Sequence, residues 1–131
     1  MGSRVTFYGY VKSDEIPIIM NATDIAILPY KRVTESGVLH LYAAYSLPII
    51  TSDLDAFREI KMKYDCIETF SLKLGHRDLA RKIQMLIFNN DKRKYLIAKC
   101  KDMVNETSWA NIAKKHLMPY SEILADNTNF T

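Results

Sequence analysis

The segment from Thr34 to Leu41, Thr-Glu-Ser-Gly-Val-Leu-His-Leu, has the clearest chemical potential in this chain. Ser36 and Gly37 leave the backbone uncrowded where a helix is expected to begin, and Ser36 is a suitable cap. The first N–H groups of a helix lack partners within it, and the helix dipole adds partial positive charge there. Gly37 and the N–H groups of Val38 and Leu39 are therefore candidate ligands for an anion such as a diphosphate. The alternative is a helix start with no ligand.

Charged and titratable side chains lie on both sides of this turn. Lys31 and Arg32 come just before it, and a guanidinium fork suits phosphate oxygens. Their alternative role is that of a loop pair with no ligand. His40 lies one turn into the expected helix and could face a cleft as a donor or acid. Its alternative is a packing or surface role.

The flanking residues predict a βαβ unit around the turn. The continuous apolar run 24–30 is typical of a strand buried on both faces, and Pro48 opens a second strand over 48–52. The helix between them should span about ten residues. Its apolar face is predicted to consist of Val38, Leu41, Tyr42 and Tyr45. The loop after the first strand would lie at the carboxyl end of the sheet, where such folds bind ligands.

Further elements are predicted along the rest of the chain. Residues 4–11 are β-branched and aromatic and predict a strand. A helix is expected from about Ser13 to Asn21, and a loop leads into a short helix over 53–60. A weak strand is predicted over 66–70, and helices follow from His76 onward. The pattern indicates an α/β fold with a parallel sheet and C-terminal helices.

Composition excludes several classes of protein. Hydrophobic residues make up 48% and charged residues 25%, the usual mixture for a globular domain. A net charge of +3 is too small to indicate a nucleic-acid partner. No apolar run is long enough to span a membrane and no signal peptide is present. A cytoplasmic location is therefore expected, with Cys66 and Cys100 as free thiols; weak attraction to an anionic membrane surface stays open.

The chain resembles the C-terminal, donor-binding domain of GT-B retaining glycosyltransferases, the glycosyl transferases group 1 family. The resemblance extends from about residue 4 to 124 and is carried by segments 5–11, 22–29, 36–41, 48–53 and 107–113 with Tyr120. It implies a Rossmann-like, three-layer parallel sheet. It also implies retaining transfer of a sugar from a UDP- or GDP-sugar to a glycan or lipid-linked acceptor, without a metal or cofactor. No metal-ligand cluster, nucleophile–base pair or P-loop occurs in the sequence, and no catalytic residue is assigned.

The same resemblance implies roles for the residues of the turn. The diphosphate would lie against Ser36–Leu39, and Glu35 and His40 would lie near the sugar; a solvated acid is an equal alternative for Glu35. Many relatives carry two glutamates around the glycine of this loop, and the second accepts the ribose hydroxyls. Those positions are Thr34 and Tyr42 here, so the ribose contact is altered.

The length suggests one partial domain. Residues 4–125 are expected to form an incomplete donor-binding domain and 126–131 a frayed tail. The first two strands of the family's domain would precede residue 5, which leaves the strand at 4–11 without a neighbour. The chain is therefore interpreted as a fragment, a decayed gene or one piece of a split enzyme, inactive without an N-terminal acceptor domain or companion chain. The rival interpretation is a non-catalytic binding or assembly module that pairs through that strand with another polypeptide, a second copy of this chain included.

Overall fold

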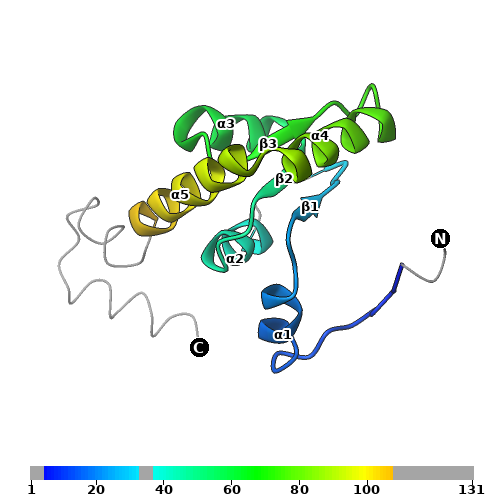
Figure 1. Cartoon of the computed structure of the whole chain (residues 1–131), viewed down its shortest axis with the longest axis vertical. Coiled ribbons are helices and arrows are strands. Elements are labelled where there is room, and N and C mark those ends of the chain that lie inside the picture. Colours follow the sequence, from blue (N-terminus) through cyan, green and yellow to red (C-terminus); the bar gives the residue numbers. More distant parts are fainter. Residues whose placement is uncertain (1–4, 33–36, 108–131) are drawn as a thin grey trace.

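The computed structural model describes residues 5–32 and 37–107, which form a parallel sheet with helices on both faces (Figure 1). The elements in chain order are α1 (Ile16–Asn21), β1 (Ala26–Leu28), α2 (Gly37–Ala44), β2 (Ile49–Ser52), α3 (Asp55–Tyr64), β3 (Glu68–Phe70), α4 (His76–Phe88) and α5 (Asn90–Glu106). This arrangement confirms the predicted Rossmann-like α/β class.

The three strands are arranged in the order β1-β2-β3 and are parallel throughout. Ala26 lies opposite Ile49 in the first pair, and Thr51 lies opposite Thr69 in the second. All four residues of β2 are buried because this central strand is covered on both faces. The predicted strands at 24–30, 48–52 and 66–70 are confirmed, each with shorter bounds.

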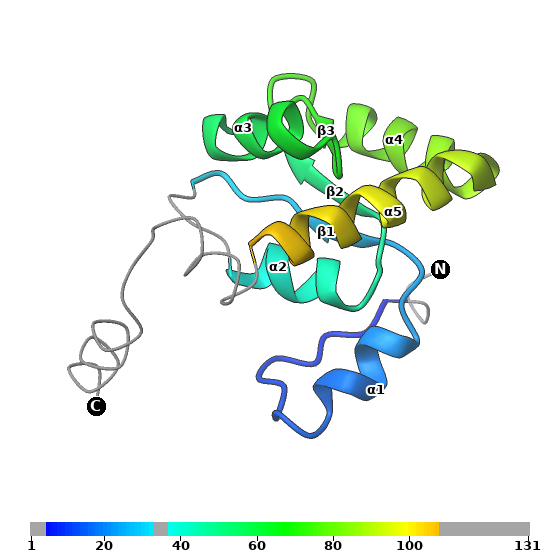
Figure 2. The ribbon, with the colours of Figure 1, turned by 90° about the vertical axis from the view of Figure 1, so that its left-hand side faces the viewer.

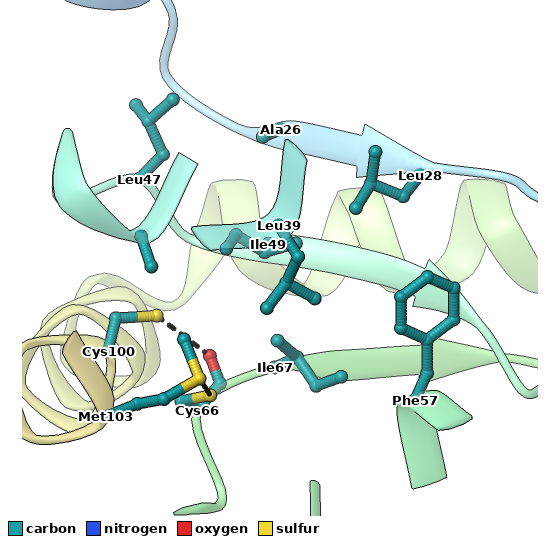
Figure 3. Close-up of a cluster of buried hydrophobic side chains, with 11 residues drawn as sticks. Ala26, Leu28, Leu39, Leu47, Ile49, Phe57, Cys66, Ile67, Cys100 and Met103 are labelled. Carbon is teal, nitrogen blue, oxygen red and sulfur yellow. Dashed lines mark hydrogen bonds between the residues drawn. The ribbon is translucent and has the colours of Figure 1, made fainter. Parts of the chain in front are cut away.

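One face of the sheet packs against α2, α3 and the C-terminal half of α5 (Figure 3). Leu39 of α2, Phe57 of α3 and Ile67 before β3 are 0% exposed there. Cys100 and Met103 of α5 close the layer, where the thiol of Cys100 donates to the carbonyl oxygen of Cys66 at 3.2 Å. The hydrogen bond with Cys66 and burial raise the pKa of the Cys100 thiol, so this thiol stays neutral and acts as a packing group.

The other face packs against α4 and the N-terminal half of α5. Ile50, Phe70, Leu86 and Leu96 form its buried centre. Because Leu96 belongs to this layer and Cys100 to the opposite one, α5 crosses from layer to layer past the amino ends of the strands (Figure 2). The hydroxyl of Tyr95 donates to Asp65, just before β3, at 2.5 Å and fixes this crossing.

The prediction of a strand over 4–11 was wrong for residues 5–11, which form no strand. Val5, Phe7, Tyr8 and Tyr10 are exposed by 62–93%, and Gly9 has a positive φ of 63°. Residues that favour strands adopt them only with a neighbour to pair with. Within the described ranges this segment pairs with none of the three strands of the sheet.

The predicted apolar face of α2 also needs correction. Leu39 and Ala43 are the buried positions, whereas Val38 is 38% exposed and Tyr42 is only half-buried. Almost every residue of α2 is apolar, so spacing alone did not distinguish one stripe from another. The helix is confirmed, and the small side chain of Ala43 faces the core.

Candidate functional site

The carboxyl ends of the three strands are joined by hydrogen bonds between their loops. The hydroxyl of Ser52, at the end of β2, donates to the carbonyl oxygen of Tyr30, after β1, at 2.5 Å. The next residue, Asp53, accepts a bond from the backbone N–H of Leu72, after β3, at 3.2 Å. The last residue of β2 and the residue that follows it thus hold the loops after both neighbouring strands at this edge of the sheet.

Residues in the first turn of α3 contact the loops at this edge. Its Arg58 lies 3.6 Å from Asp53 and 3.3 Å from Asp55, so it fixes the carboxylate that holds the third loop. The ring of Phe57 is fully buried and lies 6.2 Å from the ring of Tyr30, centroid to centroid. The loop after β1 therefore leaves the sheet over a rigid aromatic support.

The loop between β3 and α4 is held by Asp78. Its carboxylate accepts the backbone N–H of Ser71 at 2.7 Å and the guanidinium of Arg81 at 2.7 Å. Ser71 in turn accepts the N–H of Leu74 at 3.2 Å, and Gly75 turns into α4 with a φ of 68°. The Ser71 N–H first, and then Arg81, hold the pKa of Asp78 below its usual range.

This lowered pKa predicts a pH dependence of stability. A carboxyl whose pKa is lower when folded stabilises the fold above its unfolded pKa, and this contribution disappears as pH falls through the folded pKa. We expect Asp78→Asn to destabilise the chain most at neutral pH, with a difference from the unmodified chain that shrinks below about pH 4. Urea unfolding at pH 7, 5 and 3 measures this.

The control for this test is Asp102→Asn, which changes an exposed carboxylate on α5. It should produce no comparable pH-dependent difference, since it leaves the loop before α4 untouched. A difference for Asp78→Asn of equal size at pH 3 and pH 7 would contradict the role assigned to its charge.

The described residues of the expected donor site lie in the loop after β1 and in the first turns of α2. Gly37 opens this helix and is exposed. The side chain of Leu39 is 0% exposed and belongs to the core, so only its backbone faces the start of the helix. His40 is exposed one turn further on, and Lys31 and Arg32 are exposed in the loop that leaves β1.

Two expected site residues, Glu35 and Ser36, lie outside the described residues, as do Thr34 and the closing segment 108–131. The structure therefore describes only part of the expected site: the exposed basic pair after β1 and the first turn of α2. Val38, which follows Gly37 in the first turn of α2, is 38% exposed.

The backbone at Gly37 is open on its outer side. Apart from its chain neighbours and the backbone of its own helix, no described atom lies within 4 Å of the position that a Cβ on Gly37 would take. Its φ also lies outside the left-handed region, so local geometry does not require glycine there. Packing within the described chain therefore does not explain this glycine.

Tyr42 lies one turn deeper in α2, at a position where the resemblance implies a glutamate. Its ring packs against the core layer of α2 and α3 but is only half-buried. Burial, and to a smaller extent Tyr30, raise the pKa of its phenol. At neutral pH it is therefore a neutral group and cannot replace a carboxylate as a charged acceptor.

Sequence reasoning did not identify the residues that hold the loops of this edge. Ser52, Asp53, Ser71 and Asp78 were present in the expected segments but received no role. The available signal was their position, because a hydroxyl or carboxylate follows directly at the end of β2 and β3. Such residues are the ones that can satisfy loop N–H and C=O groups at a sheet edge.

Metal sites and membrane-spanning helices are both absent from the described residues. No group of three or more histidine, cysteine, aspartate or glutamate side chains is placed to hold a metal ion there. In the same part of the chain, none of the helices combines the length and apolar character needed to cross a membrane.

Comparison with known proteins identifies the class. The chain matches the family described as glycosyl transferases group 1 over residues 1–99 of its 131 residues. No curated protein matches the chain. Because the match covers more than half of the sequence, the chain belongs to the glycosyl transferases group 1 family, as the resemblance implied. The match includes β1, α2, β2 and β3, the elements that form the edge described above.

Proposed function

We propose that the chain binds the nucleotide diphosphate of an activated sugar at the carboxyl edge of its sheet, as the donor-binding part of a retaining glycosyltransferase. The observation that carries this proposal is the open backbone at Gly37, at the start of α2 and directly after the loop from β1. A helix start at the carboxyl edge of a parallel sheet combines unpaired N–H groups with positive dipole charge.

In this proposal, the diphosphate is bound by Ser36, Gly37, Val38 and Leu39, the last three of which lie in the first turn of α2. Lys31 and Arg32 add positive charge from the preceding loop, where both side chains are exposed and can reach an anion. Glu35 and His40 are assigned to the sugar. The chain's contribution to catalysis is then positioning and charge stabilisation rather than a nucleophile.

The nucleotide is expected to bind weakly. A neutral, half-buried Tyr42 replaces the carboxylate that accepts the ribose hydroxyls in relatives. We propose that residues 4–125 act as one partial domain and that the acceptor is held by an N-terminal domain or companion chain, so that this chain alone transfers no sugar. A cytoplasmic setting, with peripheral contact to a membrane, is part of the proposal and fits two free, buried cysteines.

Paired substitutions at Gly37 test the site. Gly37→Asp and Gly37→Asn have the same shape but differ in charge, and neither meets a described neighbour at Cβ. Calorimetric titration with UDP-glucose and GDP-mannose should show an affinity at least about tenfold lower for Gly37→Asp than for Gly37→Asn. Gly37→Asp should also keep its thermal stability, because an acid in the first turn favours the helix.

The possible results separate clearly. Equal affinities of the two variants would remove the diphosphate from this turn. No heat up to millimolar donor with the unmodified chain would contradict an autonomous donor site, while leaving family membership untouched. A loss of affinity that accompanies unfolding in both variants would assign the effect to folding instead of charge.

The alternative function is a non-catalytic binding or assembly module that retains the fold. One observation favours it: Phe7 and Tyr10 are 93% and 90% exposed in a segment that pairs with no described strand. Exposed aromatic side chains at this density are typical of surfaces that contact another polypeptide.

A further inference from the structure

Positive charge is concentrated around the start of β3. Glu68 is the first residue of this strand, and its buried carboxylate is contacted by ammonium groups from α3, α4 and α5. These belong to Lys61 at 3.5 Å, Lys82 at 3.3 Å and Lys92 at 3.9 Å. Glu68 lies at the amino end of β3, whereas the donor is proposed to bind at the carboxyl edge of the sheet. The cluster is therefore a separate feature of the molecule.

The three lysines have more donors than this carboxylate can accept. Lys61 and Lys82 both contact its Oε1 atom, so the sum of the two distances, 6.8 Å, is the largest separation that their Nζ atoms can have. The described acceptors of the three ammonium groups are the two oxygens of Glu68 and the carbonyl oxygen of Ile67. Each ammonium group has three N–H donors, and the side chains are 22–34% exposed. Several of these donors therefore face solvent next to one another.

A further lysine and a further acid surround this cluster. The ammonium groups of Lys92 and Lys99 lie over the ring of Tyr95, 5.1 and 5.5 Å from its centroid. Asp65 accepts the hydroxyl of the same tyrosine at 2.5 Å. Four lysines and two carboxylates thus give this surface a formal charge of +2, compared with +3 for the whole chain. Like charges this close repel one another, and a bound anion would relieve that repulsion.

The chemistry of the cluster fits a phosphate group. A phosphate monoester carries a charge of about −1.5 to −2 at pH 7 and has three strong acceptor oxygens. One such group can therefore accept from two or three neighbouring ammonium groups and balance the excess charge of the surface. A chloride ion has a single charge and no separate acceptor atoms, so it matches the cluster less well.

We propose that Lys61, Lys82 and Lys92 form a second anion site, which binds a phosphate group beside Glu68. The bound group would join α3, α4 and α5 from outside, as the carboxylate joins them from within. A free phosphate ester and the headgroup of an anionic lipid share this chemistry. The proposal does not depend on the donor site.

Thermal unfolding of the full chain in sodium phosphate, with sodium chloride at equal ionic strength as reference, tests this inference. The midpoint should rise with phosphate concentration and approach the dependence expected for one site. Lys82→Gln combined with Lys92→Gln should weaken phosphate binding at least about tenfold. The matched control is Lys94→Gln combined with Lys101→Gln, which removes the same charge at exposed positions of α5 and should bind as the unmodified chain does.

Two further variants give results that a loss of folding does not produce. Glu68→Gln should bind phosphate at least about threefold more tightly, because its carboxylate no longer competes for the ammonium groups. This gain is expected even though the variant is less stable in chloride. Gly37→Asp, which alters the proposed donor site, should respond to phosphate as the unmodified chain does. Failure of the donor site therefore leaves this test intact.

Vesicle flotation identifies the source of the phosphate group. Retention on phosphatidylcholine vesicles that contain phosphatidic acid, with loss in the Lys82→Gln and Lys92→Gln double variant, would assign the site to a lipid headgroup. Binding of soluble phosphate without such retention would assign it to a free ester. Equal stabilisation by phosphate and chloride, or equal responses of the two lysine-pair variants, would overturn the proposal. Weaker phosphate binding by Glu68→Gln would also overturn it.

Discussion

Replacing Phe57 by alanine is expected to lower the free energy of unfolding by about 3–5 kcal/mol. The ring is 0% exposed and packs between the sheet and the start of α3, against the ring of Tyr30. Removal of the ring leaves a cavity, because the core residues around it are held by the strands of the sheet and cannot move in to fill the space. This loss is a large part of the 5–15 kcal/mol typical of small domains. Urea or thermal unfolding followed by circular dichroism measures it.

The matched control is Phe88→Ala at the end of α4. That ring is 80% exposed, so the same chemical change should alter stability by less than about 0.5 kcal/mol. A loss for Phe57→Ala as small as that expected for Phe88→Ala would show that Phe57 is not a core residue. The loop that it supports at Tyr30 would then lack the rigid base described above.

Replacing Glu68 by glutamine is expected to destabilise the chain by about 2–3 kcal/mol. Its buried carboxylate lies 3.5 Å from the ammonium group of Lys61, 3.3 Å from that of Lys82 and 3.9 Å from that of Lys92. These lysines come from α3, α4 and α5, so one charge joins three helices to the start of β3. An amide keeps the shape but leaves three cations facing one another.

The lysine side chains are 22–34% exposed, which keeps the expected loss below that of a fully buried pair. The control is Glu59→Gln on α3, an exposed carboxylate in no ion pair given by the described residues, with an expected change below about 0.5 kcal/mol. Salt should reduce the stability of the unmodified chain relative to Glu68→Gln. A Glu68→Gln variant that is as stable as the unmodified chain would contradict the electrostatic role of Glu68.

The strands were predictable because local and tertiary requirements agree in them. The run at 24–30 is apolar without interruption, as a strand covered on both faces must be, and it contains β1. The segment 5–11 has equally strong strand propensity but forms no strand. Propensity describes how well a residue fits a sheet, and the structure decides whether a neighbouring strand is present.

The candidate site was predictable only where it depends on one segment. The helix start at Gly37 follows from a small residue between two strands, and the structure has a helix beginning there. The bond from Ser52 to Tyr30 joins residues 22 positions apart, and the bond from Leu72 to Asp53 spans 19. Such pairs depend on which loops meet at the edge, and no local pattern specifies that.

The path of α5 has a practical consequence for anyone who shortens this polypeptide. Residue 99, where the family match stops, falls between Leu96 and Cys100, which belong to opposite layers. Expression of the matched range alone would retain Leu96, which packs in the core layer of α4. It would remove Cys100 and Met103, which belong to the core layer of α2 and α3. A chain that ends where the family match ends would thus lack the C-terminal half of α5 and its contact between the two core layers, whereas a chain that extends beyond Thr107 keeps it.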